Sequence, residues 1–232
     1  MRDLIARRAA RLLRPGSVVN LGIGIPTLLA KYLDPDVIHL HTENGLLGVG
    51  PPPRPGEEDP NLVDASKKLV TRRTGASFFD SAASFAMLRG GHVDAAVLGG
   101  LEVDETGLLA NWSVPGDPVL GVGGAMDILA GVRTIIVAMP HVTKEGAPKL
   151  VRRCALPLTS LRPVDWIVTE LATFRREDRR LVLVELAPGV TLEEVRDRTE
   201  ASHLVRLDPA FPGRPAAARS WRRRSSPSWR CP

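Results

Sequence analysis

The sequence predicts an α/β fold with an open, largely parallel sheet that is covered by helices. Short runs of β-branched and aliphatic residues alternate along the chain with segments in which apolar residues recur at helical spacing. One run, within residues 92–100, is almost continuously apolar, which is typical of a strand buried on both faces of a sheet. A chain of 232 residues is long enough to bury the core of one such domain.

The first elements follow from apolar spacing and from turn residues. Residues 4–13 have the pattern of an amphipathic helix, and Arg14-Pro15-Gly16 ends it. Residues 17–21 are expected to be a strand, followed by a glycine-containing loop and a helical run through Tyr32, with Pro26 in its first turn. The next strand begins near Val37 and ends where Asn44-Gly45 turns the chain sharply.

The later elements repeat this alternation. Residues 77–91 are expected to form a helix that buries Phe78, Phe79, Phe85 and Met87. Further strands are expected at 92–100, 133–138, 164–169 and 181–186, with a glycine-rich loop at 121–124 that opens a helix ending near Ala130. Thr191 caps a last helix from Leu192, with Glu193 and Glu194 in its first turn.

Glu43 is the main candidate for chemistry because it lies where a strand ends and a tight turn begins. Ligands of parallel α/β sheets bind at the carboxyl ends of strands, so a carboxylate there can face a substrate. The alternative is that Glu43 only accepts a hydrogen bond from the adjoining turn.

The segment Leu40-His41-Thr42-Glu43-Asn44-Gly45-Leu46-Leu47-Gly48 resembles the Ser-Glu-Asn-Gly signature of family I CoA-transferases, in particular the B (β) subunit of the 3-oxoacid type. The likeness extends from about Leu4 to about Ser202. Thr42 replaces the usual Ser, and we expect its hydroxyl to keep the local hydrogen bond. The resemblance implies that Glu43 is the nucleophile and carries CoA as a covalent glutamyl-CoA thioester.

The resemblance also implies a set of CoA-binding residues, namely Asn20, Gly22, Gly24, Lys67, Gly124 and Ala125. The two glycine loops suit this role because a ligand can approach their backbone closely. Simpler explanations remain for three positions: Asn20 caps its own strand, Lys67 forms a surface pair with Lys68, and Gly124 serves tight packing. Ser66 and Leu108 replace a Gly and an Asp of the family pattern.

The reaction implied by the resemblance is transfer of CoA between a short 3-oxo acyl-CoA and a carboxylic acid, such as succinyl-CoA and acetoacetate. It implies an A (α) subunit as partner, in an α2β2 assembly, with CoA as substrate and no permanently bound cofactor. A 3-oxoadipate or short-chain fatty acid CoA-transferase, an acyl-CoA hydrolase, and a regulatory or sugar-phosphate-binding protein with a structural Glu43 are the alternatives.

Composition limits the other classes of function. No apolar run of transmembrane length or signal segment is present, so no membrane contact and a cytoplasmic location are expected. Two cysteines and the consecutive acids Glu57-Glu58-Asp59 do not suggest a metal site. Gly22-Ile23-Gly24 lacks the third glycine and the acidic residue of a dinucleotide-binding fingerprint.

The positive charge is concentrated at the C-terminus. The net charge of the chain is +5, but six arginines and no acids follow residue 213, so the remaining chain carries 25 basic and 26 acidic groups. We expect residues 1–207 to be the catalytic domain and 208–232 to be a disordered basic tail rich in Pro, Arg and Ser, or a C-terminus with a shifted reading frame. Trp221 and Trp229 could stack on bases, but charge runs are usually solvated, so nucleic acid is not an expected partner.

Overall fold

The computed structural model describes residues 1–116, 121–209 and 211. Its main sheet contains β1 (Val18–Leu21), β2 (His39–Thr42), β3 (Leu46–Val49), β4 (Arg72–Phe78), β5 (Ala95–Leu98), β8 (Thr134–Ala138), β10 (Trp166–Val168), β11 (Ala172–Glu177), β12 (Arg180–Leu186) and β13 (His203–Val205). A small second sheet contains β6 (Glu102–Asp104), β7 (Leu109–Ala110) and β9 (Leu150–Val151). The helices are α1 (Arg2–Ala10), the 3₁₀ helix η1 (Pro26–Tyr32), α2 (Ser81–Arg89), α3 (Ala125–Gly131) and α4 (Leu192–Asp197).

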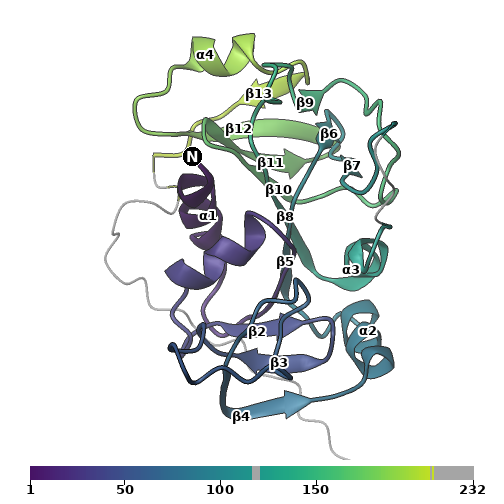
Figure 1. Ribbon diagram of the computed structural model, residues 1–232. Coiled ribbons are helices and arrows are strands. Elements are labelled where there is room, and N and C mark those ends of the chain that lie inside the picture. The colour runs from purple at the N-terminus through teal and green to yellow at the C-terminus, as the bar shows by residue number, and fades with distance from the viewer. Residues whose placement is uncertain (117–120, 210, 212–232) are drawn as a thin grey trace, which may run out of the picture.

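The strands of the main sheet lie in the order β13-β12-β11-β10-β8-β5-β1-β2-β3-β4 (Figure 1). The central strands β10, β8, β5, β1 and β2 are mutually parallel. Antiparallel pairs flank them, with β3 and β4 on one side and β11 and β12 on the other. The predicted class, an open and largely parallel sheet in an α/β fold, is confirmed.

Helices cover both faces of the central strands, with α1 and η1 on one face and α2 and α3 on the other (Figure 1). In β5, Ala95 and Val97 pack in the core below α1 and η1, whereas Ala96 and Leu98 pack in the core that includes α2 and α3. Because successive side chains point to opposite faces, a strand buried on both needs an apolar residue at every position. This explains why the apolar run within residues 92–100 predicted its strand correctly.

The structure corrects the prediction for residues 77–91. Residues Arg72–Phe78 form the edge strand β4, and the helix begins only at Ser81, where the Asp80 side chain accepts a hydrogen bond from the Ala83 amide. Phe78, expected in the core, is therefore 60% exposed, while Phe79 and Phe85 are half-buried. The charged and glycine-containing sequence of β4 has no apolar alternation that would have indicated a strand.

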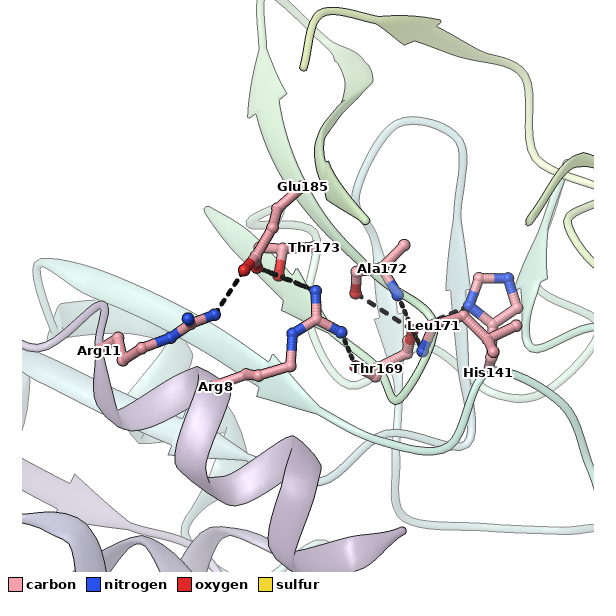
Figure 2. A network of polar contacts seen from close by, with 8 residues as sticks. All are labelled: Arg8, Arg11, His141, Thr169, Leu171, Ala172, Thr173 and Glu185. Carbon is pink, nitrogen blue, oxygen red and sulfur yellow. Dashed lines mark hydrogen bonds and ion pairs between the residues drawn. The ribbon is translucent and has the colours of Figure 1, made fainter. Parts of the chain in front are cut away.

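A buried arginine in the N-terminal helix α1 forms hydrogen bonds with residues of β11 and β12 (Figure 2). Arg8, only 3% exposed, donates to the Thr169 carbonyl at 2.7 Å, to Thr173 Oγ1 at 3.1 Å and to Glu185 Oε2 at 2.9 Å. Arg11 pairs with the other oxygen of Glu185. Burial alone would raise the pKa of Glu185, but attraction and hydrogen bonding from Arg8, with bonds from Thr173 and Arg11, lower it.

The described chain continues beyond the predicted boundary at residue 207. The Asp208 amide donates to the Val184 carbonyl at 2.9 Å, and the Phe211 ring lies 5.6 Å from the Trp166 ring. The rest of the predicted tail, with Trp221 and Trp229, lies outside the described residues, so its disorder stays a prediction. No helix within the described ranges is long and apolar enough to cross a membrane.

Candidate active site

Glu43 lies in the turn that joins β2 to β3. The Gly45 amide donates to the Thr42 carbonyl at 3.0 Å, and Gly45 has a φ of +118°, which favours glycine. A Cβ at Gly45 would lie 2.0 Å from the Phe79 carbonyl oxygen, so no other residue fits. The turn therefore fixes a half-buried Glu43 at the carboxyl end of a parallel strand, as its sequence position predicted.

Thr42 ties this turn to the segment that follows β3. Its hydroxyl donates to Asn44 Oδ1 at 2.8 Å and accepts from the Ala65 amide at 2.9 Å. Asn44 in turn donates to the Val63 carbonyl at 2.9 Å. A hydroxyl at position 42 therefore makes the local hydrogen bonds, and a threonine supplies it as well as a serine.

The structure brings Asn20 and Glu43 together. In the parallel pairing of β1 and β2, Asn20 lies opposite His41, and Glu43 follows two positions later on the same side. Asn20 is completely buried, and its Nδ2 donates to Glu43 Oε2 at 2.9 Å. Its amide therefore contacts the carboxylate directly, whereas the alternative from sequence was a cap on its own strand.

His41 is part of the same cluster and was not identified from the sequence. Its Nδ1 lies 3.3 Å from Asn20 Nδ2, its Nε2 lies 3.1 Å from Ser84 Oγ on α2, and its ring stacks on Phe79 at 5.9 Å. Burial lowers the pKa of His41 to about 4, so the ring is neutral near pH 7. The two-residue spacing between His41 and Glu43 was the available signal, because it places both side chains on one face of β2.

Gly124 approaches Glu43 from the other side of the cluster. A Cβ built on Gly124 would lie 3.7 Å from Glu43 Cγ and 2.9 Å from Phe85 Cε1. Gly124 is the N-cap of α3, and the Ala125 amide makes a long bond of 3.4 Å to the Val122 carbonyl. The glycine thus leaves room beside the carboxylate that a larger residue would fill, and it packs tightly against Phe85 as well.

The loops of Gly22, Gly24 and Lys67 are shaped by contacts and backbone geometry of their own. The Gly22 amide pairs with the Val97 carbonyl at 2.8 Å, and Gly24 has a φ of +95°. Lys67 is exposed and has a φ of +61°, which is unusual for a residue other than glycine. These loops follow β1 and β3, and their role in binding a ligand stays a prediction.

A cavity of about 520 Å³ lies between η1, β2 and the segment 64–70. Its walls are mainly aliphatic, and Lys67 is not part of the lining. The polar groups come from Thr27, Lys31, His41, Thr42, Asp64 and Lys68. Lys68 Nζ lies 3.4 Å from Thr27 Oγ1. Lys31 and Lys68, rather than the predicted Lys67, are therefore the lysines that line this cavity.

Glu58 and Asp59 accept hydrogen bonds from backbone amides of the loop in which they lie. Glu58 Oε2 accepts from the Gly56 amide at 2.7 Å, and Asp59 Oδ1 accepts from the Asn61 amide at 2.9 Å. Within residues 1–116 and 121–209, no group of three or more His, Cys, Asp and Glu side chains could hold a metal ion. The chemistry available at the cluster is that of one carboxylate, oriented by an amide and bordered by glycine backbone.

Comparisons with known proteins agree with one another. Residues 2–198 match the family described as Coenzyme A transferase. The chain is 51% identical over 206 residues to a Bacillus subtilis protein named as the B subunit of a probable succinyl-CoA:3-ketoacid coenzyme A transferase, covering 88% of this chain and 95% of that relative. It is 52% identical over 206 residues to an Escherichia coli K12 protein named as the β subunit of acetate CoA-transferase, covering 88% and 94%.

Solved structures of enzymes with different reactions share the fold. The acyl-CoA transferase YdiF of E. coli O157:H7 matches as an apoenzyme with a TM-score of 0.72 at 25% identity, over 90% of this chain and 42% of that one. This chain thus spans less than half of that solved chain. YdiF also matches as a thioester complex with CoA, with a TM-score of 0.69 at 25% identity. The decarboxylase AibA/AibB matches with a TM-score of 0.66 at 20% identity over 91% of this chain and 90% of that one, so the fold alone does not decide the reaction.

Proposed function

The chain belongs to the coenzyme A transferase family, and from this premise we propose that Glu43 carries CoA as a covalent thioester during transfer between a short 3-oxo acyl-CoA and a carboxylic acid. The observation that carries the proposal is the 2.9 Å hydrogen bond from buried Asn20 to Glu43, at a turn that holds the carboxylate at the strand end. An amide that reaches the carboxylate from another strand fixes the direction in which Glu43 is presented, as a nucleophile requires. The YdiF thioester complex with CoA supports the same chemistry.

The steps conserve the energy of the thioester. The Glu43 carboxylate attacks the carbonyl of the acyl-CoA, the CoA thiolate leaves, and a mixed anhydride remains. The thiolate then attacks the Glu43 carbonyl of the anhydride, which releases the first acid as a carboxylate and leaves a glutamyl-CoA thioester. The second acid reverses this sequence, so the new acyl-CoA departs and Glu43 is a carboxylate again. No proton or electron is gained or lost overall.

Both attacks pass through tetrahedral oxyanions that need hydrogen-bond donors. We assign the backbone N–H groups of Gly124 and Ala125 to this role, because Gly124 borders the Glu43 side chain. One well-placed donor of this kind is worth about 3 kcal/mol. The loop of Gly22 and Gly24, together with Lys67, is assigned to the body of CoA, whose remote binding energy can be used in the reaction.

The partner is an A (α) subunit, and we infer an α2β2 assembly in the cytoplasm. The relatives that match over nearly their whole length are named as B or β subunits, and the YdiF chain is long enough to contain a second half. Their names differ in the acid, succinate with a 3-ketoacid in one and acetate in the other, at nearly equal identity. The acceptor therefore has to be determined with a panel of short acids.

The test is a search for the covalent intermediate. The chain is co-expressed with the α subunit of its own organism, mixed with acetoacetyl-CoA or succinyl-CoA, and analysed by intact mass and peptide mapping. A CoA adduct on the peptide that contains Glu43, removed by succinate or acetate with formation of the new acyl-CoA, is the expected result. Glu43→Gln should abolish the adduct and lower turnover by about 10³-fold or more.

One control variant and two contrary outcomes distinguish the proposal from its alternatives. Glu58→Gln, in the exposed loop, should leave adduct and turnover unchanged. Free CoA released without a new acyl-CoA would indicate an acyl-CoA hydrolase. Full turnover of Glu43→Gln, or a folded complex that forms no adduct and turns over nothing, would contradict the assignment of Glu43.

A further inference from the structure

The oriented hydrogen bond between Asn20 and Glu43 raises the question of what holds the amide in this orientation. An Asn side chain has a donor end and an acceptor end of nearly the same shape. Only the donor end can face the Glu43 carboxylate, because two oxygens in that position would repel. A residue that prevents rotation of the amide therefore controls the direction in which Glu43 is presented.

The oxygen end of Asn20 does not fix the amide. Asn20 Oδ1 is buried and has no hydrogen-bond partner among the described residues. The orientation therefore depends on the nitrogen end, whose first hydrogen points to Glu43 Oε2 at 2.9 Å and whose second faces His41, with Nδ1 at 3.3 Å and the carbonyl oxygen at 3.4 Å. His41 is thus the other contact of the donor end.

Ser84 and Phe79 set the state of the His41 ring. A neutral imidazole has one donor and one acceptor nitrogen, so Nδ1 can accept from Asn20 only when Nε2 carries the proton. Ser84 Oγ, completely buried on α2, lies 3.1 Å from Nε2 and can accept that proton's hydrogen bond. The Phe79 ring stacks on His41 with an interplanar angle of 12°, which holds the ring plane.

We propose that His41 and Ser84 are positioning residues, which keep the Asn20 amide donor directed at Glu43 by stabilising the Nε2–H tautomer of His41. The opposite tautomer would place an N–H of His41 against the N–H of Asn20 and favour rotation of the amide, with Oδ1 turned to the carboxylate. When Glu43 exchanges its charge for a thioester, the contact with His41 remains and keeps the amide in place for the next step. The catalytic consequence rests on the proposed role of Glu43, whereas the tautomer and the amide orientation do not.

The first test does not require catalysis. In the ¹⁵N-labelled complex with the α subunit, long-range ¹H–¹⁵N spectra of His41 should show a neutral ring protonated at Nε2 between pH 6 and 8. Ser84→Ala should shift the tautomer equilibrium toward Nδ1–H, whereas His39→Phe, an exposed substitution on the same strand, should leave it unchanged. A His41 ring protonated at Nδ1 in the unaltered complex would overturn the proposal.

The second test measures thioester formation on Glu43 in a single turnover. His41→Phe keeps a planar ring and removes both hydrogen bonds, so we expect the rate to fall by about 10- to 100-fold with little change in the dissociation constant of CoA. His41→Asn, which keeps an acceptor near the position of Nδ1, should recover most of the loss. His39→Phe is the matched control and should react at the unaltered rate.

A double substitution separates positioning from general destabilisation. If the two residues act through one amide, His41→Phe with Ser84→Ala should be no slower than His41→Phe alone. Fully additive losses, or a His41→Phe complex that forms the thioester at the unaltered rate, would overturn the proposal. Absence of the thioester in the unaltered complex would instead contradict the proposed function, and the spectra would still decide the orientation. Thermal unfolding of each complex identifies variants that fail to fold, for which His41→Asn and Ser84→Ala provide milder changes.

Discussion

Lys67 and Lys68 are neighbours in sequence but differ in backbone conformation and in the groups that their side chains contact. Both are exposed, but Lys67 has left-handed backbone geometry, and the side chain of Lys68 contacts Thr27 beside the cavity below η1. A non-glycine residue at positive φ costs free energy that the fold keeps only where the surroundings demand it. Here the surroundings include the turn itself, in which the Lys67 amide donates to the Asp64 carbonyl at 2.9 Å and the Lys68 amide donates to Asp64 Oδ1 at 2.9 Å. The contact of Lys67 with CoA stays a prediction from the resemblance.

Replacement of Lys67 tests this assignment. Lys67→Ala should raise the KM for acyl-CoA about tenfold with a smaller change in kcat, because an ion pair or charge-assisted hydrogen bond to CoA is lost. Lys144→Ala, at an exposed loop position remote in sequence, is the control and should change neither constant. A larger rise in KM for Lys68→Ala than for Lys67→Ala in the same steady-state assay would assign the CoA contact to the other lysine.

At the scale of elements, α1 packs on the sheet through its apolar face and is also held there by the ion pair of Arg8 with Glu185. Ile5, Ala6 and Ala9 pack in the core with η1, while Arg8 reaches from the helix to Thr169, Thr173 and Glu185. The sequence predicted the helix from its apolar spacing, and the same spacing places Arg8, three positions after Ile5, on the buried face. It does not tell which distant groups this arginine meets. The position of β11 and β12 beside α1 supplies the partners of Arg8, Thr173 and Glu185.

Arg8→Met should therefore destabilise the protein far more than the same change one residue earlier. Removal of one partner from a buried ion pair leaves Glu185 with insufficient compensation, and we expect the free energy of unfolding to fall by about 3–5 kcal/mol. Arg7→Met, at an exposed position, should change it by less than about 0.5 kcal/mol. Urea unfolding followed by circular dichroism measures both, and equal effects would show that the Arg8 contacts contribute little.

At the scale of the whole molecule, the sequence predicted best those strands that are buried on both faces of the sheet. The central strands β5, β8 and β10 contain apolar runs and were predicted, whereas β4 and β11, with arginines and no continuous apolar run, were not. Glu43 could be identified from its strand end and its resemblance. The spacing of His41 from Glu43 gave a signal for its side of the strand, but its contact with Ser84 could not be predicted, because it joins residues 43 positions apart and depends on how α2 packs against β2.

The pH dependence of stability should also reflect buried histidines. Burial lowers the pKa of His41 to about 4, and burial with repulsion from Arg198 and His203 lowers that of His141 to about 4. Since an unfolded histidine has a pKa near 6.5, the unfolded chain binds more protons between these values, so stability should fall as the pH drops from about 6.5 to 4. Each histidine contributes a slope of up to about 1.4 kcal/mol per pH unit.

Denaturant unfolding at a series of pH values measures this slope. His141→Gln should reduce the slope in that window, even if it lowers stability at every pH, because one proton-uptake site of the unfolded state is removed. His39→Gln, at the exposed first position of β2, is the control variant. A free energy of unfolding that stays constant from pH 7 to 5 would contradict the prediction.

The Arg8 contacts have a consequence for biosynthesis. The partners of this arginine lie 161 to 177 positions further along the chain, so α1 leaves the ribosome well before the strands that complete its contacts. At synthesis rates of about 5–20 residues per second, roughly 9 to 35 seconds pass before Glu185 is made. During this interval Arg8 lacks Glu185, the acid with which it pairs in the folded protein, so this ion pair can form only after most of the described chain has been translated.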